Sequence, residues 1–327
     1  MLNYIFRRLG YMLVTLFLIT ILGYLIVELP PGSYVETEVS RLRQQGLNLN
    51  AEQITALTAR YGLDKPAYER FVIWASHFIR GDFGQAFSVN LPVKRIIGDR
   101  LGYTMLISVL SMLVVWGLSI PIGVYSATHR YTIPDYMITA MQFIGMAIPG
   151  FLIALILMVF AQKYLGQQVG GLFSSKYMNA PWSVDKVIDL FSHLWIPVIV
   201  LAFGGTAGLS RVMRANLLDV LNMQYIQTAR AKGLKENTVI WKHAVRNSLH
   251  VVIMMMGGIL PGIISGETIT AMVLNMPTTG PMYFSALINQ DTYLAVTFLV
   301  FLAILLLLGN LLADILLAVV DPRIRYE

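Results

Sequence analysis

Hydrophobic residues along this chain are gathered into long, nearly uncharged blocks separated by polar stretches. Six such blocks occupy residues 9–29, 105–127, 138–161, 194–210, 249–274 and 294–319. A run of about 20 apolar residues can cross the hydrocarbon core of a bilayer as an α-helix. A soluble protein would instead spread its apolar residues through amphipathic helices. The pattern therefore predicts an all-α polytopic membrane protein with six transmembrane helices.

The polar stretch between the first two blocks, residues 30–100, is predicted to be a small helical insertion. Asn50 and Gln53 match a capping box before a helix that would stop at Gly62. A second helix would follow, capped by Asp64 and ended by Gly81. Its apolar face consists of Phe71, Trp74, Ala75 and Phe78. We expect this face to pack against the spans, and contact with an external docking protein is the alternative.

The basic residues give the orientation. Twelve Lys and Arg lie in the N-terminal stub, the turn at Arg130, the stretch 211–246 and the tail, whereas the short loops on the other side hold only three, Lys163, Lys176 and Lys186. By the positive-inside rule both termini are cytoplasmic, and the long insertion is external because its length permits translocation whatever its charge. The first block lacks a small-residue cleavage site and is expected to be retained.

These expectations divide the chain into four parts. They are the N-terminus with the first span (1–29), an external insertion (30–100), a transmembrane core (101–320) with a cytoplasmic loop at about 211–248, and a cytoplasmic tail (321–327).

Composition removes several classes of function. The chain contains no cysteine, so disulfides and thiolate chemistry are excluded. It has no Gly-Lys pair, no His-Glu-x-x-His and no Gly-x-Ser-x-Gly, which leaves no phosphate loop, zinc protease or serine hydrolase motif. The net charge of +6 comes from residues that flank the spans, so membrane lipid is expected as a partner and nucleic acid is not.

The cytoplasmic stretch 223–248 is predicted to form a helix, a sharp stop and a second helix. Gly233 suits the left-handed position that ends a helix, and cations lie in the preceding turn. From these residues alone, a basic loop on anionic lipid and a helix that docks on another protein are equally compatible with the pattern.

The same stretch resembles a known loop. The spacing of Gln227, Thr228 and Ala229 from Gly233 and His243 is similar to that in binding-protein-dependent importer permeases, and the run Thr-Ala-Arg-Ala-Lys-Gly-Leu resembles their peptide-importer subfamily. In that family the loop is a coupling helix held in a groove of an ATPase subunit. The resemblance therefore implies that ATPase coupling belongs to Gln227, Thr228, Ala229, Arg230, Ala231, Lys232, Gly233 and Leu234.

Within this loop we expect Ala229 and Ala231 to present small side chains to the groove, and Gly233 to end the helix. Further similarities lie in Tyr61-Gly-Leu-Asp-Lys-Pro66 and in Gly266-Glu267-Thr268. The chain departs from the family where His250 replaces a proline and in the stretch 276–280.

The resemblance is to the B-type permease of dipeptide, oligopeptide and nickel importers, and it implies a type I ABC importer permease fold in a bacterial or archaeal cytoplasmic membrane. It also implies a second permease subunit, in a heterodimer, and an external solute-binding protein. Two cytoplasmic ATPase subunits would bind ATP and magnesium. This chain would itself hold no cofactor or metal and would not be an enzyme. Nickel complexes, glutathione-like compounds and oligosaccharides remain alternative substrates to peptides.

Glycines at positions 258, 262 and 266, with Pro261 among them, indicate either tight helix packing or a helix that lines a path. With the resemblance, we expect the translocation path to include Pro149, Gly262, Gly266 and Glu267. The rival interpretation is an ion-coupled carrier in which Glu267 and Asp314 would relay protons. A membrane scaffold without any path is a third interpretation.

Overall fold

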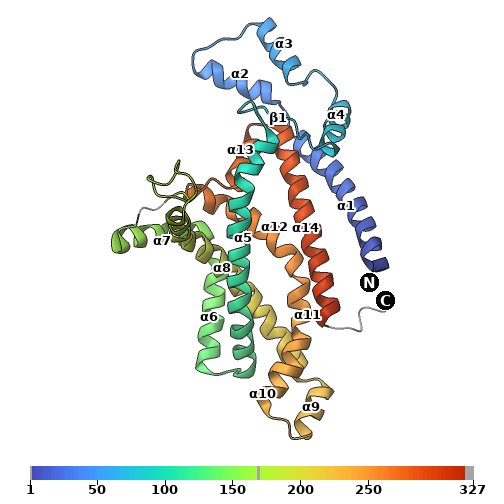
Figure 1. Cartoon of the computed structure of the whole chain (residues 1–327), viewed down its shortest axis with the longest axis vertical. Coiled ribbons are helices and arrows are strands. Elements are labelled where there is room, and N and C mark those ends of the chain that lie inside the picture. Colours follow the sequence, from blue (N-terminus) through green and yellow to red (C-terminus); the bar gives the residue numbers. More distant parts are fainter. Residues whose placement is uncertain (1, 168–169, 321–327) are drawn as a thin grey trace. The chain divides into compact units, whose positions relative to one another are not determined.

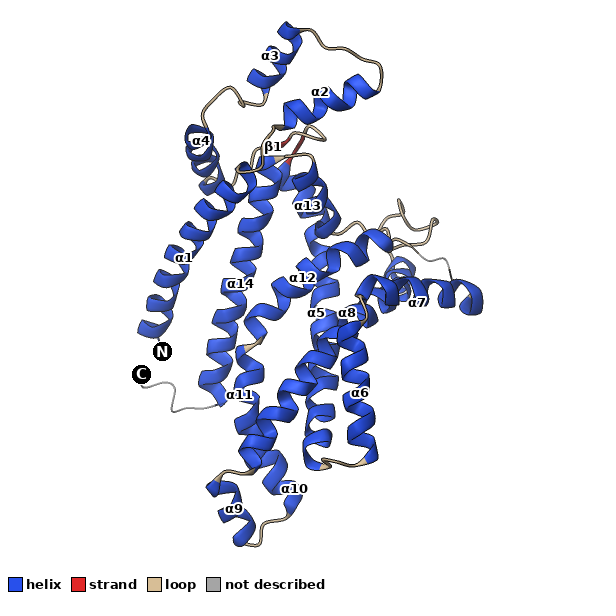
Figure 2. Ribbon diagram, turned by 180° about the vertical axis from the view of Figure 1, so that it is seen from behind, coloured by secondary structure: helices blue, strands red, loops and turns tan. Residues whose placement is uncertain are grey.

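A computed structural model describes residues 2–167 and 170–320 of the chain. The described part is mostly helical, with one antiparallel pair of two-residue strands, β1 (Gln85–Ala86) and β2 (Leu91–Pro92) (Figure 2). The chain forms two compact units: Met1–Gly102 with Thr278–Leu305, and Tyr103–Pro277 with Leu306–Glu327.

The first unit contains the N-terminal helix, the insertion and the chain that follows the glycine-rich span (Figure 1). Its elements are α1 (Leu2–Glu28), α2 (Tyr34–Gln44), α3 (Ala51–Arg60), α4 (Ala67–Ile79), the start of α5 (Val93–Thr128), α13 (Thr279–Ile288) and the start of α14 (Thr292–Val320).

Local sequence signals place the ends of the helices in the insertion. The predicted capping box is confirmed: Gln53 N donates to Asn50 Oδ1 at 2.8 Å, and Asn50 N donates to Gln53 Oε1 at 2.9 Å. Gly62 also follows α3 in the left-handed region, with φ +66°. The predicted Asp64 cap is wrong, because Pro66 is the N-cap and has no side-chain cap bond. Asp64 lies two residues too early to reach the first free amides of α4.

Helix α4 packs on α1 and α14 through the predicted apolar face. Trp74 is 3% exposed and lies in a cluster with Tyr24, Val296 and Val300. Its indole nitrogen donates to the Thr297 hydroxyl at 3.4 Å, which gives the buried donor a partner. The packing interpretation of this face is therefore confirmed within the first unit.

The second unit contains the remaining helices. They are most of α5, α6 (Ile133–Ala147), α7 (Gly150–Leu165), α8 (Val184–Leu221), α9 (Gln224–Ala231), α10 (Glu236–Thr238), the π-helix η1 (Val239–Val245), α11 (Arg246–Met254), α12 (Met256–Val273) and the end of α14.

Among the described residues, four helices are long and apolar enough to cross a membrane, namely α1, α5, α8 and α14, and the bent pair α6–α7 would make five. The predicted span 249–274 corresponds to α11 and α12, which are separated at Met255. The predicted span 194–210 lies within α8, a helix of 38 residues that extends beyond it at both ends as Val184–Leu221.

The predicted continuous span 138–161 is wrong, because α6 and α7 meet at an angle of 100°. Ile148 stands before a proline and adopts an extended conformation, φ −83° and ψ 123°. A residue before proline is sterically kept out of the helical region, so α6 ends here. Pro149 then serves as the N-cap of α7.

Close helix contacts in the second unit depend on glycine. A Cβ on Gly123 of α5 would lie 2.7 Å from Met213 Cβ and 2.8 Å from the Ser210 carbonyl oxygen, both on α8. A Cβ on Gly309 of α14 would lie 2.9 Å from the Gly257 carbonyl oxygen of α12. Neither pair of helices could approach so closely with a larger residue at the crossing.

Candidate functional site

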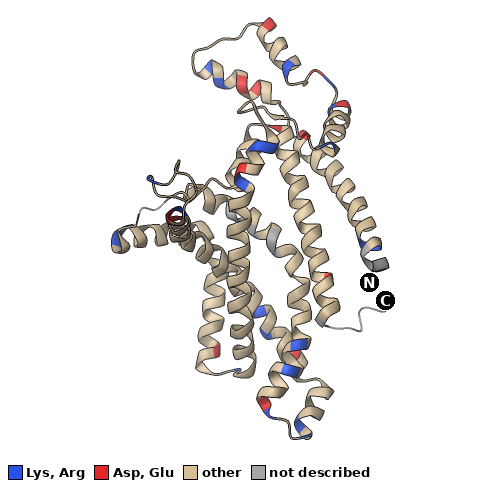
Figure 3. Ribbon diagram, in the orientation of Figure 1, with Lys and Arg blue, Asp and Glu red and all other residues tan. Residues whose placement is uncertain are grey.

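The helix-stop-helix segment lies at one end of the second unit, where α9 and α10 extend past the ends of α6 and α11 (Figure 1). Residues 211–246 carry seven Lys and Arg against two acidic residues. Figure 3 marks several Lys and Arg positions along the ribbon at this end of the unit, whereas α6 carries a single charged residue, Asp135, and the part of α5 that belongs to this unit carries none. The predicted order of helix, stop and helix is confirmed.

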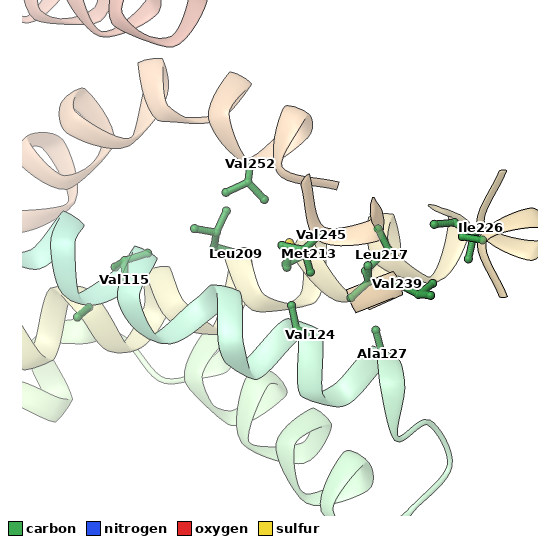
Figure 4. Packing of buried hydrophobic residues seen from close by; sticks show 13 residues of the cluster. Val115, Val124, Ala127, Leu209, Met213, Leu217, Ile226, Val239, Val245 and Val252 are labelled. Carbon is green, nitrogen blue, oxygen red and sulfur yellow. The ribbon is translucent and has the colours of Figure 1, made fainter. Parts of the chain in front are cut away.

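Helix α9 is held to its own chain by one face. Ile226 is fully buried and Ala229 is 8% exposed, and both belong to a core cluster with Leu217 of α8 and Val239 of η1. Figure 4 shows Ile226 and Val239 in this cluster beside the α8 side chains. Eight residues are too few for a stable isolated helix, so this packing fixes α9 in place.

Gly233 ends α9 with the predicted left-handed conformation, φ +74°. The Gly233 amide donates to the Arg230 carbonyl at 2.9 Å, and the Leu234 amide donates to the Ala229 carbonyl at 3.4 Å. These two bonds are the Schellman pattern that satisfies the last carbonyls of a helix. A Cβ at this position would meet no described atom within 4 Å, so glycine is required by conformation and not by space.

Two polar contacts close the segment. Asn247 Nδ2 of α11 donates to the Tyr225 hydroxyl at 2.5 Å. Across the Gly233 turn, Arg230 Nη2 lies 2.6 Å from Glu236 Oε1, and its Nε also donates to both carboxylate oxygens. Hydrogen bonding to Arg230 lowers the pKa of Glu236 below its ordinary value, and the pKa of Arg230 is raised by the same bond.

The predicted coupling residues do not share one face. Seven are exposed: Gln227, Thr228, Arg230, Ala231, Lys232, Gly233 and Leu234. The exception is Ala229, which points into this chain's own core and leaves Ala231 as the alanine on the outer side. The two alanines were expected to act alike, and helical geometry separates them because positions two apart lie on opposite sides.

The residues expected along the path are only partly described. Pro149 is exposed at the start of α7, and the neighbouring Gly150 faces Val200 of α8 and Thr270 of α12, with a Cβ distance of 3.4 Å to Val200 Cγ1. Gly262 is exposed and would meet no described atom within 4 Å. Gly266 and Glu267 belong to α12, but the surroundings of these two positions lie outside the described part of the structure.

Two residues of the site, Ile226 and Glu236, were not predicted from the sequence. Ile226 anchors α9, and its signal was an isolated aliphatic residue in a polar helix, three positions before Ala229. Glu236 pairs with Arg230, and its signal was a single acid among basic residues just after the glycine. Among the described residues, His, Asp and Glu form no group that could hold a metal ion.

Comparison with known proteins identifies a family whose model covers the helix-stop-helix segment and most of the second unit. The family model described as "Binding-protein-dependent transport system inner membrane component" matches residues 119–326, which include α8 to α12. The chain therefore belongs to this family of ABC transporter permeases, as the loop had indicated.

Particular relatives match along the whole chain. The oligopeptide transport system permease protein AppB of Bacillus subtilis is 37% identical over 325 residues, covering 99% of each chain. The dipeptide transport system permease protein DppB of Lactococcus lactis is 29% identical and covers 99% of this chain and all of that one. A chain of the MetNI methionine ABC transporter, solved in inward-facing conformations, has a TM-score of 0.53 at 17% identity. It covers 69% of this chain and 96% of its own length and shows the same fold.

Proposed function

We propose that this chain is a permease subunit of a peptide importer, and that the outer face of α9 with the Gly233 turn docks on a cytoplasmic ATPase subunit. Support for the docking role comes from the division of α9 into two faces. On its inner face, Ile226 and Ala229 are packed against α8 and η1, so α9 cannot move without these helices. Its outer face presents Gln227, Ala231 and Leu234 with no described partner that would occupy them.

The substrate class follows from the relatives, whose names give oligopeptide and dipeptide transport. The remaining assignments follow from the family and the charge pattern. A second permease subunit, two ATPases that hydrolyse ATP, and an external binding protein would complete the importer. Both termini would be cytoplasmic, since the basic α9 end of the second unit belongs on the cytoplasmic side.

In this importer the segment 30–100 is the external insertion and 101–320 the core, with 1–29 and 321–327 at its ends. The path would run past Pro149 and along α12, the helix that contains Gly262, Gly266 and Glu267. Gly262 supports this because its open surroundings leave room for a substrate or for a partner subunit.

Gly233→Val tests the coupling role. Valine in the left-handed region costs about 1–2 kcal/mol and would redirect the chain after α9. We expect the complex to show weak ATPase binding, and substrate-stimulated ATP hydrolysis and uptake to fall together. Co-purification of the ATPase and hydrolysis in lipid with binding protein and peptide measure both effects.

The chain offers a matched control in Gly62→Val. Gly62 ends α3 with φ +66° and the same pair of bonds, from Gly62 N to Ala59 O and from Leu63 N to Thr58 O, both 3.0 Å. It carries the same backbone strain in the insertion and should keep ATPase binding. Wild-type ATPase binding and stimulation in Gly233→Val would remove the coupling role from α9. Uptake by the chain without any ATPase would favour an ion-coupled carrier.

A further inference from the structure

Arg214 of α8 forms an ion pair with Asp135 of α6, and neither residue belongs to the coupling segment. Arg214 Nη2 lies 2.8 Å from Asp135 Oδ2, and Arg214 Nε lies 3.1 Å from Asp135 Oδ1. The Asp135 side chain is 3% exposed and that of Arg214 is 26% exposed. The geometry is bidentate, which is the arrangement that makes arginine-carboxylate pairs directional.

Two further groups complete the hydrogen bonding of this carboxylate. The Ser126 hydroxyl at the end of α5 bonds to Asp135 Oδ1 and accepts from Arg214 Nε at 2.9 Å. The Tyr131 amide donates to Asp135 Oδ2 at 3.0 Å from the turn between α5 and α6, where Tyr131 has φ +63°. A buried charge costs several kcal/mol unless it is paired and hydrogen-bonded, and here both carboxylate oxygens have partners. We call Ser126, Asp135 and Arg214 the clasp.

The clasp adjoins the surface that holds α9. Met213 and Leu217 of α8 flank Arg214 along the helix, and both are fully buried in the cluster that contains Ile226. Val124 and Ala127 of α5 belong to the same cluster and lie on the α5 side of it in Figure 4. A single stretch of α8 thus contacts α9 through apolar side chains and fixes the α5–α6 hairpin through charge.

Apolar packing and the clasp constrain motion differently. Hydrophobic contact is non-directional, so helices joined by it alone can slide or rotate with little change in buried area. A bidentate pair with two added hydrogen bonds is lost when its helices shift by a fraction of their spacing. The clasp therefore adds a directional constraint that joins α5, α6 and α8 at one point, beside the Gln142–Ser210 hydrogen bond between α6 and α8 (2.9 Å) and the close approach of α5 to α8 at Gly123.

We propose that Asp135 and Arg214 are positioning residues for transport: the clasp converts displacement of α9 into a joint movement of α5, α6 and α8. This inference rests on the coupling role proposed above for α9. Without the clasp, ATPase closure would still move α9 and α8 but would be transmitted incompletely to the α5–α6 hairpin. Hydrolysis would continue with less transport.

The test is the ratio of peptide taken up to ATP hydrolysed, measured in vesicles that contain the whole importer and the binding protein. Asp135→Asn keeps the shape of the side chain and removes its charge. We expect assembly and ATPase binding to be retained and the ratio to fall on the order of tenfold, the factor that corresponds to about 1.4 kcal/mol. The matched control is Asp219→Asn, an exposed carboxyl on the same helix, which should leave the ratio unchanged.

A second variant separates positioning from folding. Arg214→Lys keeps the charge and loses the fork, so it should give an intermediate ratio with normal assembly. If Asp135→Asn fails to assemble, Arg214→Lys decides: a reduced ratio supports the proposal and a wild-type ratio overturns it. A wild-type ratio in an assembled Asp135→Asn complex also overturns it. Failure of the coupling role is distinguishable, because it would appear as normal ATPase binding by Gly233→Val whatever the clasp variants do.

Discussion

Two helix contacts in the second unit are built on opposite principles. Helix α9 is held by a buried side chain. Ile226 has no exposed surface and packs among aliphatic side chains from α8 and η1. The contact between α12 and α14 is held because side chains are missing, since Gly257 and Gly309 bring the two backbones together.

The comparison shows which change weakens each contact. The α9 contact depends on apolar volume and is weakened by removal of atoms. The α12–α14 contact depends on empty space and is weakened by their addition. The segment with the proposed coupling role is thus attached by side chains. Helix α12 meets α14 near its first turn by close backbone approach, beside the Met256 side chain that packs on Ala313 and Leu317.

The largest effect is expected for Ile226→Ala. Removal of buried methyl and methylene groups from a well-packed isoleucine costs about 2–5 kcal/mol. Because few other side chains hold α9, the loss should appear as local opening of this segment. Tryptic cleavage after the exposed Lys232 should accelerate at least about tenfold, which corresponds to 1.4 kcal/mol of easier opening.

The control for that variant is Ile133→Ala, which removes the same atoms from a side chain that is 77% exposed at the start of α6. It should leave the cleavage rate unchanged. Equal rates in wild type and Ile226→Ala would mean that α9 is held by its polar contacts instead.

A smaller effect is expected for Gly309→Ala. The new methyl group would press on the Gly257 carbonyl oxygen and lie 3.1 Å from Gly257 Cα, and backbone atoms cannot rotate away. Gly258→Ala is the matched control because no described atom lies within 4 Å of its Cβ position. Both variants gain about 1 kcal/mol of helix propensity. The difference between their thermal stabilities in detergent therefore isolates the clash, which we expect to cost about 1–3 kcal/mol. Equal stabilities would show that the helices separate freely.

Patterns that act within a few residues were readable from the sequence. The capping box at Asn50 and the left-handed stop at Gly233 need only neighbouring residues, and both were confirmed. The apolar face that contains Trp74 was also predicted correctly, because the helical period alone assigns it.

Features that depend on distant residues were not readable. The glycines at 258 and 262 indicated either tight packing or a helix that lines a path, and the close helix contact is made by Gly257, which lies one position outside that repeat. The position of Gly309 on α14 determines which glycine of α12 makes the contact. Similarly, Ala229 and Ala231 are chemically identical, and the location of the α8 surface determines which one is buried. Pro149 was predicted as a path residue within a continuous span, whereas the 100° angle between α6 and α7 depends on where α7 can pack.

The smallest effect is expected for Glu236→Gln. It removes the ion pair with Arg230 and leaves both compared contacts, that of Ile226 and that of Gly257 with Gly309, unchanged. The paired side chains of Arg230 and Glu236 are 36% and 54% exposed, so the contribution should be at most about 1 kcal/mol and should weaken in salt. Since Arg230 lowers the pKa of Glu236, the pair adds stability above the ordinary pKa of a glutamate, and this stability is lost as the pH falls through the lowered pKa.

Trypsin digestion cannot be used in acid, so the suitable measurement is amide hydrogen exchange of α9 between neutral and acidic pH. Wild type should be slightly better protected at neutral pH and should converge with Glu236→Gln in acid, whereas Ile226→Ala should be less protected at every pH. A wild-type advantage that persisted in acid would assign the protection to hydrogen bonds of the neutral carboxyl and not to charge.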